Sequence, residues 1–199
     1  MLAALIAVTA CASAESIADY FPLATGTKWH YSSVIGNFSE SVHEEALAPV
    51  EVAGALASPI SSRTEQMRAD TTLYRVDGNT VYLVGYDPKR PLDPPRPVLK
   101  WDGAKTSWTF NGIDEGLPLQ IKAQVDRAGK RKILDRDMDV LELKMEAVLG
   151  DGKSGMRFKQ QAFYARGIGL AEMNEEQKVG KKTTKRTLRL IKFEPPEKD

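Results

Sequence analysis

The 199-residue chain has one cysteine, Cys11, and two histidines. A single cysteine cannot form a disulfide within the chain, so packing and hydrogen bonds must hold the fold together. Two histidines also provide few ligands for a histidine-based metal site. Lysine and arginine (28) nearly balance aspartate and glutamate (27), and the formal net charge is +1. We therefore expect no general attraction to nucleic acid.

Sequence patterns of common catalytic centres are absent as well. No G-x-S-x-G motif, which marks the nucleophile of many serine hydrolases, occurs in the chain. His43-Glu44-Glu45 lacks the spacing of a zinc motif. Gly152-Lys153-Ser154 resembles the end of a phosphate-binding loop, but Ala147 stands where the earlier glycine is needed. The sequence thus predicts no metal and no cofactor, and it favours a non-catalytic protein.

Residues 1–14, MLAALIAVTACASA, carry no charge and are almost all apolar or small. An apolar run of about ten residues is too short for a membrane-spanning helix, which needs roughly 20. Such a run is typical of the core of a secretory signal peptide, although no lysine or arginine precedes it here. We predict that residues 1–14 are a signal peptide.

Two routes of processing are compatible with this segment. Ala12-Ser13-Ala14 fits a cleavage site before Glu15. Val8-Thr9-Ala10-Cys11 instead resembles a bacterial lipobox, in which Cys11 is lipidated and becomes the new N-terminus. A buried N-terminal helix is the less favoured alternative, because the run ends in small residues. Either route predicts an exported protein, in the periplasm or anchored to a bacterial membrane.

Residues 15–199 show the two-residue periodicity of β-strands. Residues 28–35 (KWHYSSVI) and residues 140–149 (VLELKMEAVL) alternate between one face and the other. Turn signals fall at Asp77-Gly78, Gly129 and Gly180. We predict a single all-β domain built on an antiparallel sheet, with Trp29 and Trp108 buried.

Residues 87–97 (DPKRPLDPPRP) contain five prolines. Because proline lacks a backbone N–H, this segment is predicted to be a stiff, extended connector between two halves of the domain rather than a helix or a central strand. The pattern Pro97, Gly103, Trp108 echoes Pro22, Gly26, Trp29 and is a weak indication of an internal repeat of the two halves.

Two short motifs lie near the ends of this domain. The first is Tyr20-Phe21-Pro22-Leu23, followed by Gly26 and Trp29-His30-Tyr31; the second is Tyr164, followed by Gly167-Ile168-Gly169-Leu170. With these motifs the chain resembles a set of exported bacterial envelope proteins and lipoproteins of unknown function. The resemblance implies an antiparallel, partly open β-barrel in the cell envelope, and it implies no activity.

A sheet curled into a barrel can enclose an apolar cavity. Aromatic residues from several predicted strands are the candidate lining: Trp29, Tyr31, Tyr74, Tyr82, Trp108, Phe110, Phe163 and Tyr164. The alternative is that these side chains pack against one another and fill the interior, as in most proteins.

Three functions remain open at this point. The first is a non-catalytic module for binding or envelope maintenance, whose ligand would be a small apolar molecule or a lipid. The second is a hydrolase of envelope polymers that acts through paired carboxylates. The third is a structural subunit of an assembly, with protein partners that the sequence does not identify.

The mass of the exported product tests the signal-peptide prediction. After expression of the full chain in a bacterium, we expect a product that lacks residues 1–10 or 1–14. If Cys11 is multiply acylated, the protein will be held firmly on the membrane, and Cys11→Ser will release it into the soluble fraction. A cytosolic product that retains residues 1–10 would contradict the prediction.

Overall fold

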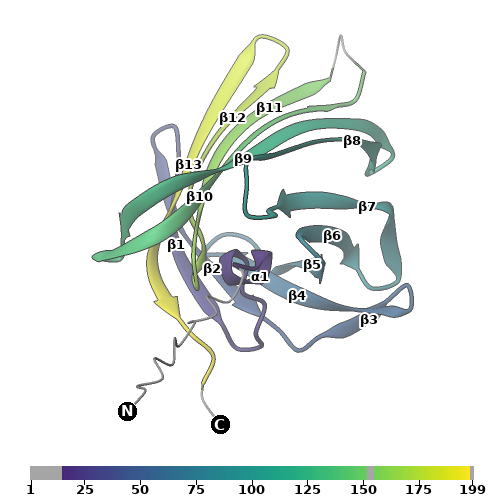
Figure 1. The fold of residues 1–199 in the computed structure, drawn as a ribbon. Coiled ribbons are helices and arrows are strands. Elements are labelled where there is room, and N and C mark those ends of the chain that lie inside the picture. The colour runs from purple at the N-terminus through teal and green to yellow at the C-terminus, as the bar shows by residue number, and fades with distance from the viewer. Residues whose placement is uncertain (1–14, 152–154, 198–199) are drawn as a thin grey trace, which may run out of the picture.

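The computed structural model describes residues 15–151 and 155–197 (Figure 1). The predicted signal peptide at residues 1–14, with Cys11, lies outside this part. Within it, the elements in chain order are α1 (Ile17–Tyr20), β1 (Lys28–Ile35), β2 (Phe38–Ala46), β3 (Val50–Val52), β4 (Ala55–Thr64), β5 (Asp70–Asp77), β6 (Thr80–Asp87), β7 (Arg90–Lys100), β8 (Thr106–Asp114), β9 (Leu117–Ile133), β10 (Arg136–Leu149), β11 (Met156–Ala165), β12 (Gly169–Val179) and β13 (Lys182–Glu194).

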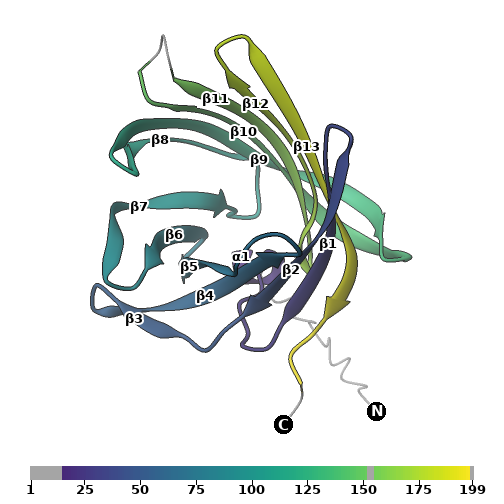
Figure 2. The same cartoon turned by 180° about the vertical axis from the view of Figure 1, so that it is seen from behind.

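The strands form one antiparallel sheet that curls into a barrel (Figures 1 and 2). Its order is β7-β6-β5-β4-β2-β1-β13-β12-β11-β10-β9-β8, and the short β3 pairs with β4 beside this path. The end strands β7 and β8 approach each other, but no backbone ladder in the described ranges joins them. The prediction of an all-β, partly open antiparallel barrel is therefore confirmed.

Strand β1 joins the two halves of the sheet because it pairs with both β2 and β13. Its pairing with β13 runs from Lys28, opposite Glu194, to Ile35, opposite Arg186, with one shift in register between His30 and Tyr31. The rings of Trp29 and Phe193, which face each other across this pair, have their centroids 6.3 Å apart. The first and last strands thus lie side by side, opposite the open seam.

The two-residue periodicity puts alternate side chains inside the barrel. In β10, Leu141 and Leu143 are buried, whereas Lys144 and Glu146 are exposed. Several residues of β10 favour helices, but burial of one face of a sheet outweighs such a preference. Trp29 (3% exposed) and Trp108 (8% exposed) are both buried, as predicted.

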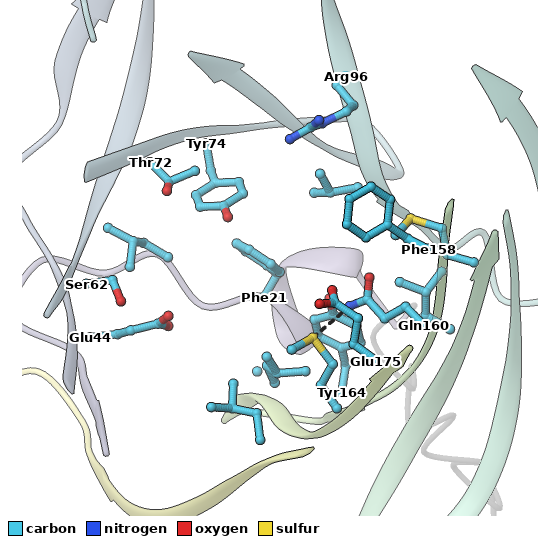
Figure 3. A pocket seen from close by; sticks show the side chains of 18 of the residues that line it. Phe21, Glu44, Ser62, Thr72, Tyr74, Arg96, Phe158, Gln160, Tyr164 and Glu175 are labelled. Carbon is cyan, nitrogen blue, oxygen red and sulfur yellow. Dashed lines mark hydrogen bonds between the residues drawn. The ribbon is translucent and has the colours of Figure 1, made fainter. Parts of the chain in front are cut away.

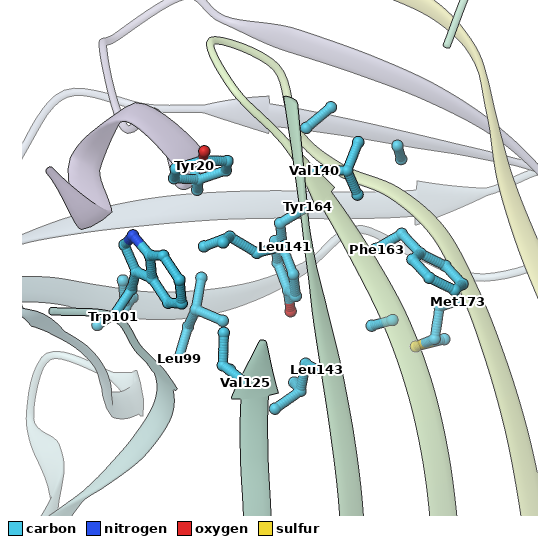
Figure 4. Packing of buried hydrophobic residues seen from close by; sticks show 14 of the residues in the cluster. Tyr20, Leu99, Trp101, Val125, Val140, Leu141, Leu143, Phe163, Tyr164 and Met173 are labelled. Carbon is cyan, nitrogen blue, oxygen red and sulfur yellow. The ribbon is translucent and has the colours of Figure 1, made fainter. Parts of the chain in front are cut away.

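Helix α1 lies inside the barrel at one end and contributes to the main core (Figures 1 and 4). Ser16 caps the helix, since its hydroxyl accepts a hydrogen bond from the N–H of Ala18. Ile17 and Tyr20 are fully buried, and Tyr20 belongs to the same cluster as Trp101. A helix of one turn is not stable alone, so this packing must hold it in place.

The two motifs noted in the sequence contact each other at this end of the barrel. The indole Nε1 of Trp29 donates a 2.6 Å hydrogen bond to the carbonyl of Ile168, and the Tyr31 hydroxyl donates one of 3.2 Å to the carbonyl of Leu170. Gly169 has a φ of +96°, and a Cβ atom there would lie 3.3 Å from Cδ of Pro22. The two motifs therefore form one structural unit.

The structure corrects the prediction for residues 87–97. Most of them belong to β7, which pairs with β6 at the edge of the sheet instead of linking two halves as a free connector. Prolines are tolerated there because an edge strand leaves one row of N–H groups without partners. The two prolines compared in the suggested internal repeat also differ in their structural positions. Pro97 lies in a strand, whereas Pro22 lies between α1 and β1.

A second correction concerns Gly129, which was predicted to mark a turn. It lies within β9, opposite Val140, next to a shift in register between β9 and β10. The turn comes later, at Leu134 and Asp135, which both adopt a positive φ. A glycine with φ of +76° in a strand is typical of a β-bulge.

Loss of the Trp29 side chain should strongly destabilise the barrel. Trp29→Ala removes a buried ring and its hydrogen bond to Ile168, so we expect the free energy of unfolding to fall by about 3–5 kcal/mol. Ile191→Ala, at an exposed position of β13, should change it by less than about 0.5 kcal/mol. Equal urea-denaturation midpoints for the two variants would contradict the assignment of Trp29 to the core.

Candidate binding cavity

The interior of the barrel contains a cavity of about 490 Å³ (Figure 3). Small-molecule sites in proteins usually have volumes of about 300–1,000 Å³. Side chains from both halves of the sheet and from the segment after α1 surround the cavity. The interior is therefore not completely filled by its own side chains.

One wall of the cavity is apolar. Strands β9, β10 and β11 contribute inward-facing side chains to it: Leu119, Ile121, Leu143, Met145, Ala147, Leu149 and Phe158. These strands are neighbours in the sheet, and alternate residues of each face inward. The wall can hold an alkyl chain or another apolar group, since it offers such a ligand no charged side chain.

The opposite wall, from β2, β4 and β5, carries polar side chains. Glu44 of β2 lies opposite Ser62 of β4 in register, and Thr72 and Tyr74 follow on β5. Figure 3 shows these side chains directed toward the cavity from one side. The cavity is therefore amphipathic, although Arg96, Asp114, Gln160, Glu175 and Arg186 also border it from other strands.

Glu44 is half-buried and borders the cavity. No residue in the described part of the chain forms a hydrogen bond or an ion pair with its carboxyl group, although the guanidinium of Arg186 is close enough to act on it. Burial raises the pKa of Glu44 to about 7, and the charge of Arg186 opposes this shift. Burial and then the charge of Glu44 raise the pKa values of Tyr31 and Tyr74.

Side chains bridge the seam between β7 and β8. Nη1 of Arg96 lies 2.6 Å from Oδ2 of Asp114, and Nη2 of Arg96 donates a 2.8 Å hydrogen bond to the Tyr86 hydroxyl. Arg96 and Asp114 come from β7 and β8, and both line the cavity. This ion pair links the two strands where they have no backbone ladder.

Four of the eight aromatic residues predicted to line a cavity do so: Trp29, Tyr31, Tyr74 and Tyr164. The others are placed elsewhere. Tyr82 packs on a second, smaller cluster that includes Leu73 and Val84. Phe163 precedes Tyr164 on β11, so its side chain faces the other side of the sheet. There the guanidinium carbon of Arg131 lies 3.8 Å from the centroid of the Phe163 ring.

Trp108 and Phe110 pack against the main core beside the cavity without lining it. Nζ of Lys100 lies 5.9 Å from the ring centroid of Trp108. The ring of Phe110 lies over Gly112, where a Cβ atom would come within 2.5 Å of it. The aromatic pattern thus identified four rings that border the cavity, but it did not distinguish them from the four that pack elsewhere.

The histidines lie on the outer face of the sheet. His30 and His43 are hydrogen-bonded through their Nδ1 atoms at 2.8 Å, and Nε2 of His30 lies 2.7 Å from Glu194. Across residues 15–151 and 155–197, no group of three or more His, Cys, Asp or Glu residues is arranged to hold a metal ion. No helix among these residues combines the length and the apolar character needed to cross a membrane.

Comparisons with known proteins give little information about this chain. No protein-family model matches it, and no curated protein sequence matches it significantly. A crystal structure described as that of a "putative lipoprotein" from Parabacteroides distasonis aligns over 88% of this chain and 98% of its own, with a TM-score of 0.47 and 10% sequence identity. A similarity of this degree does not establish a shared function.

The seam ion pair predicts a local loss of stability. Arg96→Ala would leave the largely buried carboxylate of Asp114 without its cationic partner, so the free energy of unfolding should fall by about 1–3 kcal/mol. Amide exchange in β7 and β8 should also become faster. Lys105→Ala removes the exposed pair with Asp126 and should cost less than about 1 kcal/mol. Equal stability and equal exchange in the two variants would contradict the role of Arg96.

Proposed function

We propose that this chain is a non-catalytic binding protein of the bacterial cell envelope that holds a small apolar or amphipathic molecule inside its barrel. The supporting observation is the cavity, with an apolar wall on β9–β11 and a polar wall on β2–β5. Protein interiors are normally close-packed, and an unfilled apolar cavity lowers stability. A bound ligand would restore the missing contacts.

The location in the envelope is proposed from residues 1–14, which have the pattern of a signal peptide. A lipid on Cys11 would hold the α1 end of the barrel near the membrane, because four residues span at most about 14 Å. Glu15, the first described residue, is already tied to the barrel by an ion pair with Arg127 and by a hydrogen bond from Tyr20. The anchored barrel would therefore have little freedom to move away from the bilayer.

A purely structural role and a hydrolytic role are less well supported than binding. A structural subunit gains nothing from an open interior. A hydrolase of envelope polymers would need its two carboxylates beside a groove that admits a polymer, whereas the carboxylates here, Glu44, Asp114 and Glu175, line a cavity inside the barrel. The cavity dimensions suit a small molecule better than a polymer chain.

Ligand binding can be tested on protein purified from its own envelope. We expect organic solvent to extract a lipid or another apolar molecule, which mass spectrometry would detect. The emptied protein should then bind a polarity-sensitive dye saturably, at about one dye per chain. If no ligand can be extracted and no dye binds saturably, the proposed function is wrong.

Filling the cavity provides a matched control for that experiment. Ala147 faces the cavity from β10, so Ala147→Trp should reduce dye affinity at least about tenfold by occupying the ligand's volume. Lys144→Trp adds the same ring to the same strand at an exposed position and should leave affinity unchanged. Equal binding by both variants would indicate that the dye binds outside the barrel.

A further inference from the structure

The carboxyl group of Glu44 borders the cavity without a direct partner. Glu44 is half-buried on the inner face of β2, and none of the described residues forms an ion pair or a hydrogen bond with its carboxyl group. Burying an unpaired carboxylate is costly unless a proton or a positive partner neutralises it. A cationic group on a ligand would supply an ion-pair partner for Glu44, which no described residue provides.

Aromatic rings enclose the same part of the cavity. Trp29 lies opposite Glu44 in the β1–β2 register, and Phe21, Tyr74 and Tyr164 line the same space. The Phe21 ring centroid is 5.1 Å from that of Tyr74 and 6.2 Å from that of Tyr164. Organic cations bind favourably over aromatic faces at about 6 Å or less, and several rings around one site bind ammonium groups in particular.

The charges around the cavity also favour a cation. Three acidic residues line it, Glu44, Asp114 and Glu175, against two arginines, Arg96 and Arg186. Arg96 is bound to Asp114. Arg186 donates from Nε to the Ser33 hydroxyl at 3.2 Å and lies opposite Glu175 in the β12–β13 register. The acidic side chains of the lining thus outnumber its arginines by one, and neither the Glu44 nor the Glu175 carboxyl group forms an ion pair or a hydrogen bond with a described residue. Arg186 lies close enough to lower the pKa of Glu44 but does not pair with it.

We infer that the cavity selects an amphiphile with an organic ammonium head group, which Glu44 and the surrounding aromatic rings hold while the apolar wall of β9–β11 holds the tail. The inference rests on the proposed function, because it specifies the ligand of the same cavity. Primary amines and trimethylammonium groups share the required charge, but only the amine can donate a hydrogen bond to Glu44.

The binding of such a ligand depends on pH. An ammonium group pairs with the ionised form of Glu44, and burial raises the pKa of this residue to about 7. The affinity should therefore be full above pH 8 and fall as the pH drops through 7, by about tenfold between pH 8 and pH 6. The other ionisable groups that face Glu44 across the cavity are Tyr31, Tyr74, Arg96, Asp114, Tyr164, Glu175 and Arg186. Burial shifts the tyrosines upward, away from this pH range.

The experiment compares probes with the same dodecyl tail and different head groups. The delipidated mature protein is titrated with dodecylamine, dodecyltrimethylammonium, dodecanol and dodecyl sulfate, each below its aggregation concentration, by competition with the bound dye. We expect both ammonium probes to bind at least about tenfold more tightly than dodecanol and dodecyl sulfate. A preference for dodecylamine would indicate a primary amine, and a preference for the other cation would indicate a quaternary head group.

Two neighbouring variants identify the residue responsible. Glu44→Gln should weaken binding of the ammonium probes roughly 10- to 100-fold, abolish their pH dependence and leave dodecanol binding unchanged. Glu45→Gln, at the next position of β2 on the outer face, should change none of these values. Circular dichroism of both variants checks that the barrel is intact.

The outcomes separate this inference from the proposed function. If all four probes bind equally well and Glu44→Gln has no effect, the head-group inference is overturned while apolar binding stands. Tighter binding of dodecyl sulfate than of the ammonium probes overturns it as well. If no probe displaces the dye and none binds directly, the proposed function itself fails.

Discussion

The pairing of β1 with β13 is the interaction on which the rest of the barrel depends. The strands from β1 to β7 and those from β8 to β13 are two meanders in which consecutive strands pair, except that β2 pairs with β4 and the short β3 lies beside the path. Among the described strands, only the β1–β13 ladder joins the two meanders. Its partners are far apart in sequence, so the entropy of closing a long loop opposes it. Trp29, through its bonds to Ile168 and its contact with Phe193, helps to offset that cost.

The division into two meanders also explains the character of the cavity. The second meander supplies the apolar wall, from β9 to β11, and the first supplies Glu44, Ser62 and Thr72, although Asp114, Gln160, Glu175 and Arg186 of the second meander also border the cavity. A space between two such walls suits a molecule with an apolar body and a polar end. The seam beside Arg96 and Asp114 is the one side of this space without a backbone ladder in the described structure.

The strands and most turns were predictable because the period of two is a local property of the chain. The lining of the cavity was only partly predictable, since strand pairing decides which face is inside. Phe163 and Tyr164 are adjacent, so alternation alone prevents both from facing the cavity. Glu44 shares its face with the buried Val42 and Ala46, and this was the signal that could have placed it inside. The structure of residues 87–97 was also not predictable from local sequence, because only pairing with β6 distinguishes an edge strand from a connector.

The most direct test of the account is a crystal structure of the protein purified from its native envelope without delipidation. The account predicts elongated electron density inside the barrel, with one end beside Glu44 and the other against the apolar wall near Leu143 and Phe158. An interior in which the side chains have closed together, or one that holds only ordered water, would contradict a role in binding an amphiphile.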